Sequence, residues 1–450
     1  MNEKKRHGRP RSRFTAKEIL GYLAIITVLG GLLMVILKLL APPAEEGTYN
    51  FYESPIMPLS SLSGAEDVEA ERLVTLDFGV YEEEEFRSQE EVLVTDTYIL
   101  TNPTETDVTV ELSWGFDTRF QAWDTDLIPV VTAGGAPVRG RIFPEAGGDG
   151  SLLNAKDFQA YAKALTERDL LAEAMAPVPE WDVPVKVYHF YDIAYEGDQP
   201  NVWLNVTAQY GETTNLWVRT YGAVTQDKDE IEIIFMTGED AWLYVIGDDL
   251  ENLTINGSLY RNLGGIEQYP DAEGVTYQLE TYESTFMECL WEAAEAYVPG
   301  DEMTPGMEQV TEQMRYDYAL RQIVGSGRQN PGGYHRMDDL FDHLYINQCM
   351  IYWVFSVEIP AGGSVTVSAT YRKQSSFNSG DARHGYDIAT TLGSNLNFIG
   401  QRVMLKNTDL ITIAKDGTAQ NLGIDLNTGV LEVTLDMTQE RYFLDLLRAE

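Results

Sequence analysis

The sequence predicts a mainly β protein: one N-terminal transmembrane helix followed by an Ig-like β-sandwich ectodomain, organised as two sandwiches with helical insertions. Three observations lead to this prediction. An uncharged apolar segment lies near the N-terminus, many short segments alternate apolar and polar residues, and two longer stretches repeat apolar residues at helical spacing. With 450 residues, 44% of them hydrophobic, the chain is long enough for two or three domains with sizeable cores.

The apolar segment spans residues 19–37 and reads ILGYLAIITVLGGLLMVIL, without a charged residue. As a helix it would be about 28 Å long, which matches the hydrocarbon thickness of a bilayer. Seven Lys and Arg residues precede it within residues 1–17, so the positive-inside rule places the N-terminus in the cytoplasm. We therefore predict a basic cytoplasmic tail over 1–17, a signal anchor over 18–40 that contacts the lipid bilayer through 19–40, and an extracellular C-terminal domain.

A cleaved signal peptide is the alternative for the same segment. Such a peptide would have a shorter apolar core and small residues at a cleavage site. Here prolines crowd the region that follows, LLAPPAEEG, which favours an uncleaved anchor.

The exported part of the chain is strongly acidic. Residues 39–450 contain 24 Lys and Arg against 69 Asp and Glu, because eight of the 32 basic and two of the 71 acidic residues lie before them. Their net charge of about −45 repels phosphate backbones, so we predict no nucleic-acid partner. The same charge is compatible with bound divalent cations, or with a role in keeping an extracellular domain soluble.

Residues 41–71 are rich in Pro, Ser and acidic residues and predict a flexible tether. A first β-sandwich region follows over 72–180. Within it, TYILTNPTETDVTVELSW (97–114) alternates apolar residues on both sides of the Asn-Pro-Thr at 102–104. Alternation that is broken by a proline predicts a hairpin with one face toward a core.

The rest of the chain alternates between strand and helix signals. LIPVVTAGGAPVRGRIF predicts another hairpin that turns at its Gly-Gly pair, and a helix with Asn154 as its cap is expected to interrupt the first region. A further hairpin is predicted over 353–371, across Pro-Ala-Gly-Gly, and each of the two long hairpins could nucleate one sandwich. The predicted segments are the helical insertion 154–175, a second β region 181–280, a helical insert 281–345 and a C-terminal β region 346–450.

The best candidate for a chemical site is HRMDDLFDHLYINQC. In it His335, Asp339 and His343 are spaced i, i+4, i+8, so a helix would place them on one face, where they could hold a metal ion. The alternative is a solvated helix face whose acidic residues favour the helix N-terminus. Neither a zinc-protease H-E-x-x-H nor a G-x-S-x-G nucleophile elbow occurs, and no organic cofactor is predicted.

The two cysteines, Cys289 and Cys349, leave two possibilities open. Outside the cytoplasm they could form one disulfide, or the chain could simply be poor in cysteine. Aromatic residues near the helical insert, Trp291, Tyr316 and Tyr334, could contact an extracellular protein or glycan, although core packing is the alternative for each.

Two segments carry a resemblance to known proteins. TYILTNPTETDVTVELSW resembles the opening of a family of exported or membrane-anchored bacterial domains of unknown function, in which a strand leads through Asn-Pro-Thr into a Thr- and Val-rich strand. IPAGGSVTVSATYR and the following HGYDIATTLGSNLNFIGQRVML are similar to the back half of that family. The resemblance covers about a third of the chain, and Ser-Trp-Gly-Phe at 113–116 replaces the family's usual Phe-Pro ending. It implies an exported β domain, and because the family has no assigned activity it implies no site residues.

These features together predict a single-pass, membrane-anchored extracytoplasmic protein with a non-enzymatic binding or structural ectodomain. The alternative is an extracellular metal-assisted hydrolase whose site lies in the helical insert near 335–343.

Overall fold

The computed structural model describes residues 49–79, 91–120, 130–145, 155–197, 202–220, 222–259, 261–263, 266–268, 271–298, 310–378, 380, 382–414 and 422–448. The chain divides into two units, Met1–Thr48 and Tyr49–Glu450, and only the second contains described residues. The predicted cytoplasmic tail and signal anchor therefore lie outside the described residues. Within those residues, no helix is both long and apolar enough to span a bilayer.

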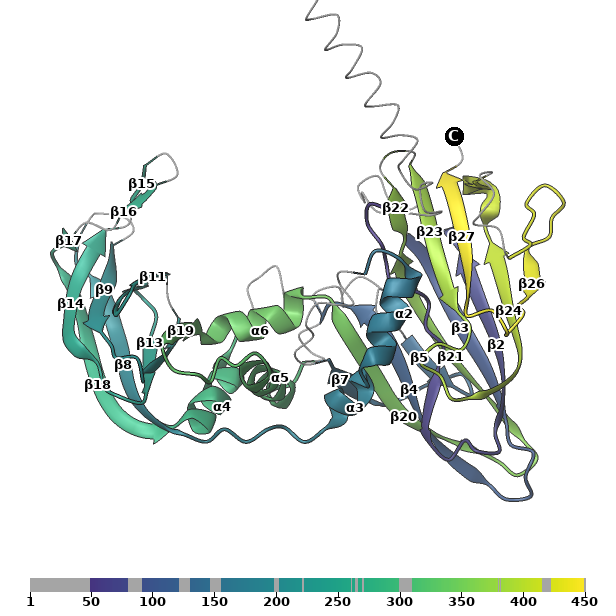
Figure 1. The fold of residues 1–450 in the computed structure, drawn as a ribbon, viewed down its shortest axis with the longest axis horizontal. Coiled ribbons are helices and arrows are strands. Elements are labelled where there is room, and N and C mark those ends of the chain that lie inside the picture. The colour runs from purple at the N-terminus through teal and green to yellow at the C-terminus, as the bar shows by residue number, and fades with distance from the viewer. Residues whose placement is uncertain are drawn as a thin grey trace, which may run out of the picture. The chain divides into compact units, whose positions relative to one another are not determined.

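The described chain is mainly β, as predicted, with several antiparallel or mixed sheets and a few helices (Figure 1). Three of the sheets contribute side chains to one large apolar core. The four-stranded sheet has the order β1 (Ser60–Ser63), β4 (Val108–Thr118), β20 (Cys349–Ile359), β7 (Arg141–Pro144). The seven-stranded sheet has the order β26 (Glu432–Thr434), β24 (Asn397–Lys406), β2 (Glu69–Asp77), β3 (Glu91–Thr101), β21 (Ser364–Gln374), β5 (Val130–Ala133), β6 (Ala136–Pro137). The third has the order β22 (Ser376–Asn378), β23 (Arg383–Ala389), β27 (Arg441–Arg448), β25 (Ile411–Ile413), with the short helix η5 (Thr408–Leu410) before β25.

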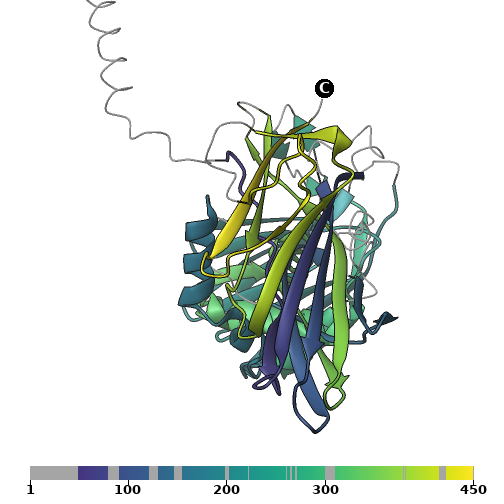
Figure 2. The ribbon, with the colours of Figure 1, turned by 90° about the vertical axis from the view of Figure 1, so that its right-hand side faces the viewer.

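The two long segments predicted as hairpins pair with each other instead of folding back on themselves. β3 pairs with β21 in the seven-stranded sheet, and β4 pairs with β20 in the four-stranded sheet. Figure 2 shows β24, β2, β3 and β21 side by side on one face of the molecule. Each segment thus crosses from one sheet to the other, so the prediction that each would nucleate its own sandwich is wrong. The predicted alternation is confirmed, because Leu112, Trp114 and Tyr98 are fully buried.

Asn102 explains why the crossing replaces a hairpin turn. Its buried side-chain amide donates to the carbonyl oxygens of Thr106 at 2.8 Å, and of Ile359 and Pro360 at 3.2 Å each. The backbone N–H of Asn102 donates to Gly363 O at 2.9 Å. One short side chain therefore satisfies backbone groups of both crossings, which fixes them against each other. The predicted hairpin at Gly-Gly 134–135 is confirmed, since β5 pairs with β6.

A buried ion pair lies inside the core that these sheets share. Arg72 on β2 and Asp96 on β3 are fully buried, with Nη2 and Oδ2 2.8 Å apart. Arg72 also donates to the carbonyl oxygens of Ile56 and Ala389. The Tyr98 hydroxyl donates to Asp96 at 3.1 Å and accepts from the Leu59 N–H at 2.9 Å. The ion pair therefore connects two neighbouring strands, the segment before β1 and the end of β23.

The described part of the predicted tether, residues 49–71, is folded into this body, so that prediction is wrong there. Ile56 and Leu59 are buried, and the Ile56 N–H donates to Asp387 O at 2.8 Å. β1 and the start of β2 also fall within these residues. Prolines at 55 and 58 exclude a helix, but they are compatible with an extended segment that packs through its side chains.

The predicted helical insertion at 154–175 is present as two shorter helices. α2 (Phe158–Glu167) begins at the cap Asp157 and α3 (Leu170–Met175) at the cap Asp169, each of which accepts a backbone N–H through its carboxylate. The predicted cap Asn154 lies outside the described residues. The inserted region that follows has its own sheets and cores.

Two five-stranded sheets share a second apolar core. Their orders are β18 (Val275–Thr285), β8 (Pro184–Tyr195), β13 (Ala241–Ile246), β10 (Asn215–Arg219), β19 (Gly333–Arg336), and β11 (Ala223–Asp227), β12 (Glu230–Phe235), β9 (Val202–Gln209), β14 (Glu251–Leu259), β17 (Asp271–Ala272). A separate small hairpin joins β15 (Arg261–Leu263) to β16 (Ile266–Gln268). The helices of the predicted insert are α4 (Phe286–Ala296), α5 (Glu312–Gly325) and α6 (Met337–Ile346), and they form a further core with β8, β10 and β13.

Replacing Arg72 by Met, or Asp96 by Leu, is expected to lower the free energy of unfolding by about 3–5 kcal/mol, because either change leaves one buried charge without its partner. The double variant is expected to lose less than either single variant, because it removes both charges. Chemical denaturation of the four proteins measures this. Additive losses in the double variant would show that the pairing itself contributes little.

Candidate functional site

The structure does not place the predicted metal residues on one helix. His335 belongs to β19, which pairs in parallel with β10, and α6 begins only at Met337. Asp339 lies in the first turn of α6 and His343 in its last. Among the described residues, no group of three or more His, Cys, Asp or Glu side chains is placed to hold a metal ion. The i, i+4, i+8 spacing predicted a shared helix face that is not formed, because His335 lies in a strand and only Asp339 and His343 lie in the helix.

His335 instead packs as a neutral side chain. Its ring lies 4.7 Å, between centroids, from the fully buried Trp217. Burial first, and the charge of Arg328 second, lower the pKa of His335 to about 4. The imidazole is therefore uncharged at neutral pH, which fits a packing role.

Asp339 does line a cavity of about 470 Å³ next to α6, together with Asp338 and Asp342; we call it the acidic cavity. Each of these carboxylates has a protein partner. Asp338 accepts the Thr220 N–H at 2.7 Å, Asp342 accepts the Tyr297 hydroxyl, and Asp339 lies 3.8 Å from an Arg336 nitrogen.

Neither cysteine is placed for nucleophilic chemistry, and the two form no disulfide. Cys289 belongs to α4 and is part of the core between the helices and the sheet, where burial raises the pKa of its thiol to about 11. Burial also raises the pKa of the Cys349 thiol. Both thiols therefore stay protonated, and a protonated thiol is a poor nucleophile.

The three candidate contact aromatics are partly packed. Trp291 is 37% exposed, and its ring lies 5.5 Å from that of Tyr316. Tyr334 packs against the core of the inserted sheets.

The strongest candidate site is a cavity of about 500 Å³ that we name the apolar chamber. It is lined by the segment around β1, by α2 and α3, and by residues of β4 and β20. The lining residues are Met57, Pro58, Ser60, Ser61, Leu62, Ser113, Gly115, Leu165, Arg168, Asp169, Leu170, Leu171, Ala172, Met175, Met350, Tyr352 and Gly393.

Strand alternation explains how β4 contributes to the chamber. Leu112 and Trp114 point into the large core, so Ser113 and Gly115 point to the other side of the strand. A Cβ at Gly115 would lie 3.1 Å from Met350 Sδ and 3.2 Å from Tyr352 Cε1. Glycine at this position therefore lets Met350 and Tyr352 lie close to β4, and any larger side chain would displace them.

The two charged residues of the chamber wall are engaged in holding the helices. Arg168 pairs with Glu173 of α3 and lies 3.4 Å from Glu145. Asp169 caps α3 by accepting the Ala172 N–H at 3.0 Å. The remaining lining is mostly aliphatic, with three methionines and a few hydroxyls.

Ser113 is the exception within this lining. Its side chain is 2% exposed, and its Oγ has no hydrogen-bond partner among the described residues. Buried hydroxyls in folded proteins are nearly always hydrogen-bonded, so an unpaired one at a cavity wall suggests a group that a ligand would satisfy.

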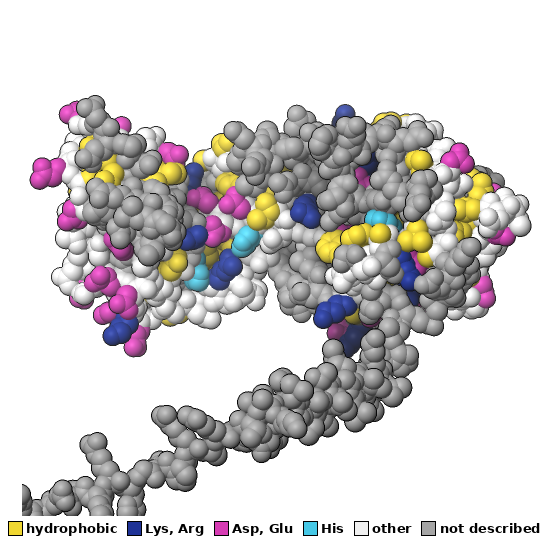
Figure 3. All heavy atoms as spheres, turned by 90° about the horizontal axis from the view of Figure 1, so that it is seen from above, with side chains coloured by type: hydrophobic (Ala, Val, Ile, Leu, Met, Phe, Trp, Pro, Cys, Tyr) yellow, Lys and Arg dark blue, Asp and Glu magenta, His cyan; other side chains and the backbone are white. Residues whose placement is uncertain are grey.

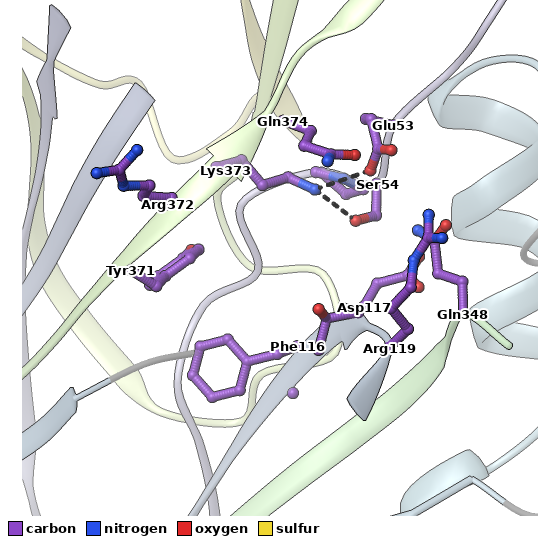
Figure 4. Close-up of a pocket in the computed structure, with 13 residues that line it drawn as sticks. Glu53, Ser54, Phe116, Asp117, Arg119, Gln348, Tyr371, Arg372, Lys373 and Gln374 are labelled. Carbon is purple, nitrogen blue, oxygen red and sulfur yellow. Dashed lines mark hydrogen bonds and ion pairs between the residues drawn. The ribbon is translucent and has the colours of Figure 1, made fainter. Parts of the chain in front are cut away.

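A second, smaller cavity of about 50 Å³ lies beside the chamber, since Gly115 lines both; we name it the polar cavity. Figure 4 shows Lys373 reaching toward Glu53 and Ser54, with Asp117 and Gln348 near each other. Lys373 Nζ is 2.8 Å from Ser54 Oγ and 3.4 Å from Glu53 Oε2. Burial raises the pKa of Asp117 to about 6, although the charge of Lys373 acts in the opposite direction.

Sequence reasoning missed both cavities. Their walls combine segments that are more than a hundred residues apart, and no short motif marks them. One signal was present: on β21, Lys373 has the same inward parity as the buried Tyr371, which puts a charge where the alternation predicts an apolar residue. The space-filling view shows how charged and apolar side chains are interspersed over one face of the described chain (Figure 3).

Comparisons with known proteins do not assign this site. No family model matches the chain, and no curated protein matches it. Among solved structures, the chain is similar to a "putative nutrient binding protein" from Legionella pneumophila, with 8% identity, 87% of this chain and 70% of that chain covered, and a TM-score of 0.28. This likeness is too low to support an argument about fold or function. The resemblance to exported bacterial domains accordingly stays a prediction.

Replacing Asp117 by Asn is expected to remove a pH dependence of stability. Because the folded pKa is about 6 and the usual value is 3.8, Asp117 favours the folded state below about pH 4, and this contribution is lost as the pH rises through 6. The loss amounts to about 3 kcal/mol. Denaturation at pH 4 and pH 7 measures it as a difference between wild type and variant.

The comparison must be made between variants because burial also raises the pKa of Asp387 to about 6. The exposed Asp409 provides the control, and Asp409→Asn should follow the wild type. Equal pH profiles for the wild type and Asp117→Asn would show that Asp117 keeps an ordinary pKa.

Proposed function

We propose that the chain is a single-pass, membrane-anchored extracytoplasmic protein with a non-enzymatic, Ig-like β-sandwich ectodomain that binds a small, neutral and largely apolar molecule in the apolar chamber. The observation that carries this proposal is the chamber itself, with the unpaired Ser113 hydroxyl in its wall. An anchor would hold such a module at the cell surface, where it meets extracellular compounds.

The size and lining of the chamber support this class of ligand. Small-molecule sites typically enclose about 300–1,000 Å³ and have mostly apolar walls with a few polar groups, and the chamber has about 500 Å³. Met57, Met175 and Met350 give it an adaptable surface, because the unbranched thioether side chain fits ligands of different shape.

The polar groups of the wall favour a neutral ligand. Arg168 and Asp169 are engaged by protein groups, so they would have to break those contacts to pair with a charged ligand. Ser113 can donate or accept one hydrogen bond, which suits a hydroxyl or carbonyl group on an otherwise apolar molecule.

The same lining supports binding without catalysis. Acid–base chemistry needs a titratable side chain that is within reach of the bound molecule and able to change its protonation state. In the described wall, the charged residues serve as a helix cap and an ion pair, and the other polar residues are hydroxyls. An extracellular protein or glycan partner would have the Trp291–Tyr316 pair available as an exposed aromatic surface.

Binding of the neutral fluorophore Nile red by the full chain in detergent tests the chamber. Replacing the exposed Ala172 by Trp is expected to abolish the saturable part of the fluorescence increase, because the indole would fill the cavity. Ala176→Trp is the matched control, since Ala176 is exposed at the end of the same helix and does not line the chamber. If both variants bind equally well, the chamber is not the binding site.

Ser113→Ala separates the ligand contact from folding. Removing an unpaired buried hydroxyl is expected to raise the free energy of unfolding by about 1 kcal/mol. The same change should weaken binding of a fatty alcohol, measured by displacement of Nile red, by about tenfold. A variant that is less stable than the wild type would mean that the hydroxyl has a structural partner.

The anchor makes a separate prediction. The full chain is expected to sediment with membranes, to be released by detergent but not by salt, and to be digested by protease added outside intact cells. Replacing Val28 and Leu32 by Arg is expected to release the chain, because two charges near the bilayer centre add about 5–7 kcal/mol to insertion. Protection from external protease would contradict the proposed orientation.

A further inference from the structure

Five charged residues line the polar cavity: Glu53, Asp117, Arg119, Arg372 and Lys373. Arg372 lies 3.8 Å from Glu91, which is not part of the lining, and it points away from Asp117 (Figure 4). Glu53 and Lys373 are buried and 3.4 Å apart, so their charges compensate each other. Asp117 is the second carboxylate in the lining. Its side-chain hydrogen bond is with Gln348, which carries no charge. Arg119 also lines the cavity but is exposed, so that solvent screens its charge.

Asp117 has an oxygen without a partner. Its Oδ1 is buried and has no hydrogen-bond partner among the described residues, while the residue lines the cavity. Burying a carboxylate oxygen costs free energy because it loses its hydration, unless a cation or a hydrogen-bond donor replaces the water. The Asp117 carboxylate therefore lacks a donor for this oxygen.

Lys373 shows which kind of cation this cavity accommodates. Its ammonium group is held by one carboxylate oxygen and one hydroxyl, Glu53 Oε2 and Ser54 Oγ. A metal ion would need more oxygen ligands, usually six for Mg²⁺ or Ca²⁺. The described residues here do not form a metal-ligand group, so a cation that donates N–H hydrogen bonds fits better.

We propose that the polar cavity binds an ammonium group, either of a free small amine or of a ligand that also occupies the apolar chamber, through the unpartnered oxygen of Asp117. Binding would make the cluster of Glu53, Asp117, Lys373 and the ligand electrically neutral. The charged groups that act on Asp117 are Lys373, Glu53 and Glu145, and Glu145 is paired with Arg168. The free-amine source does not depend on the proposed function. The chamber-ligand source rests on it, with the difference that the ligand carries an ammonium group outside the chamber, next to its neutral, apolar part.

Thermal unfolding of the full chain in detergent tests the proposal at pH 7.5 and constant ionic strength. Ammonium chloride and methylammonium chloride are expected to raise the unfolding temperature, whereas sodium chloride and tetramethylammonium chloride, which have no N–H group, are not. Asp117→Asn should abolish the rise or weaken binding by about tenfold or more. Asp409→Asn, at an exposed carboxylate, should respond as the wild type does.

A second variant keeps the test decisive if Asp117→Asn fails to fold. Lys373→Gln removes the resident ammonium group and leaves Glu53 and Asp117 both uncompensated. Its response to ammonium should therefore exceed that of the wild type. Equal responses to sodium and ammonium, or a Lys373→Gln variant with no larger response than the wild type, would overturn the proposal.

The two sources are distinguished by adding hexylammonium chloride. If the ammonium belongs to a chamber ligand, hexylammonium binds more tightly than methylammonium, and Ala172→Trp removes only this difference. If the source is a free small amine, both bind equally and Ala172→Trp changes neither. Failure of Nile red binding together with a retained ammonium response would reject the chamber function and keep the amine site.

Discussion

The ion pair between Arg72 and Asp96 is the constraint on which the three sheets around the large core depend. Two charges in an apolar core are tolerated only when each is paired and hydrogen-bonded, and here the remaining donors of Arg72 reach Ile56 O and Ala389 O. The pair therefore requires that β2, β3, the segment before β1 and the end of β23 all be in place. This requirement explains why residues 49–71 are folded even though their composition is that of a linker.

Both cavities arise because that same packing uses only one face of each strand. On β4, Leu112 and Trp114 point into the large core. Ser113 and Gly115 lie on the opposite face of the strand and line the apolar chamber with residues of α2 and α3. The two helices are short, begin at aspartate caps and bury Phe158 and Tyr161 in a cluster with Met350 and Tyr352. The polar cavity lies at the end of β21, where the inward-facing side chain changes from Tyr371, which is part of the large core, to the charged Lys373.

The sequence could predict which residues are buried, but not which strands pair. Period-two alternation is satisfied equally by a hairpin and by a chain that crosses between sheets. What distinguishes the two is long-range contact: the pairing of β3 with β21 and β4 with β20, and the bonds of Asn102. The prediction that His335, Asp339 and His343 share one helix face was wrong for a related reason, since helical spacing cannot show that His335 is still in a strand. The candidate cavities could not be predicted because their walls join segments that only the folded chain brings together.

The crossings at 102–107 and 360–363 set an order of events during biogenesis. The carbonyl oxygen of Ile359 that Asn102 requires lies 257 residues further along the chain. β3 and β4 therefore emerge from the ribosome, and cross the membrane if the chain is exported, long before β20 and β21 exist to pair with them. The inserted sheets at 184–336 have their own core and can fold first, which shortens the loop that the late strands must close. Until β20 and β21 follow, β3 can pair only with β2, and β4 only with β1, so each has one edge open. We expect these open edges to be the part of the nascent chain that most needs a chaperone.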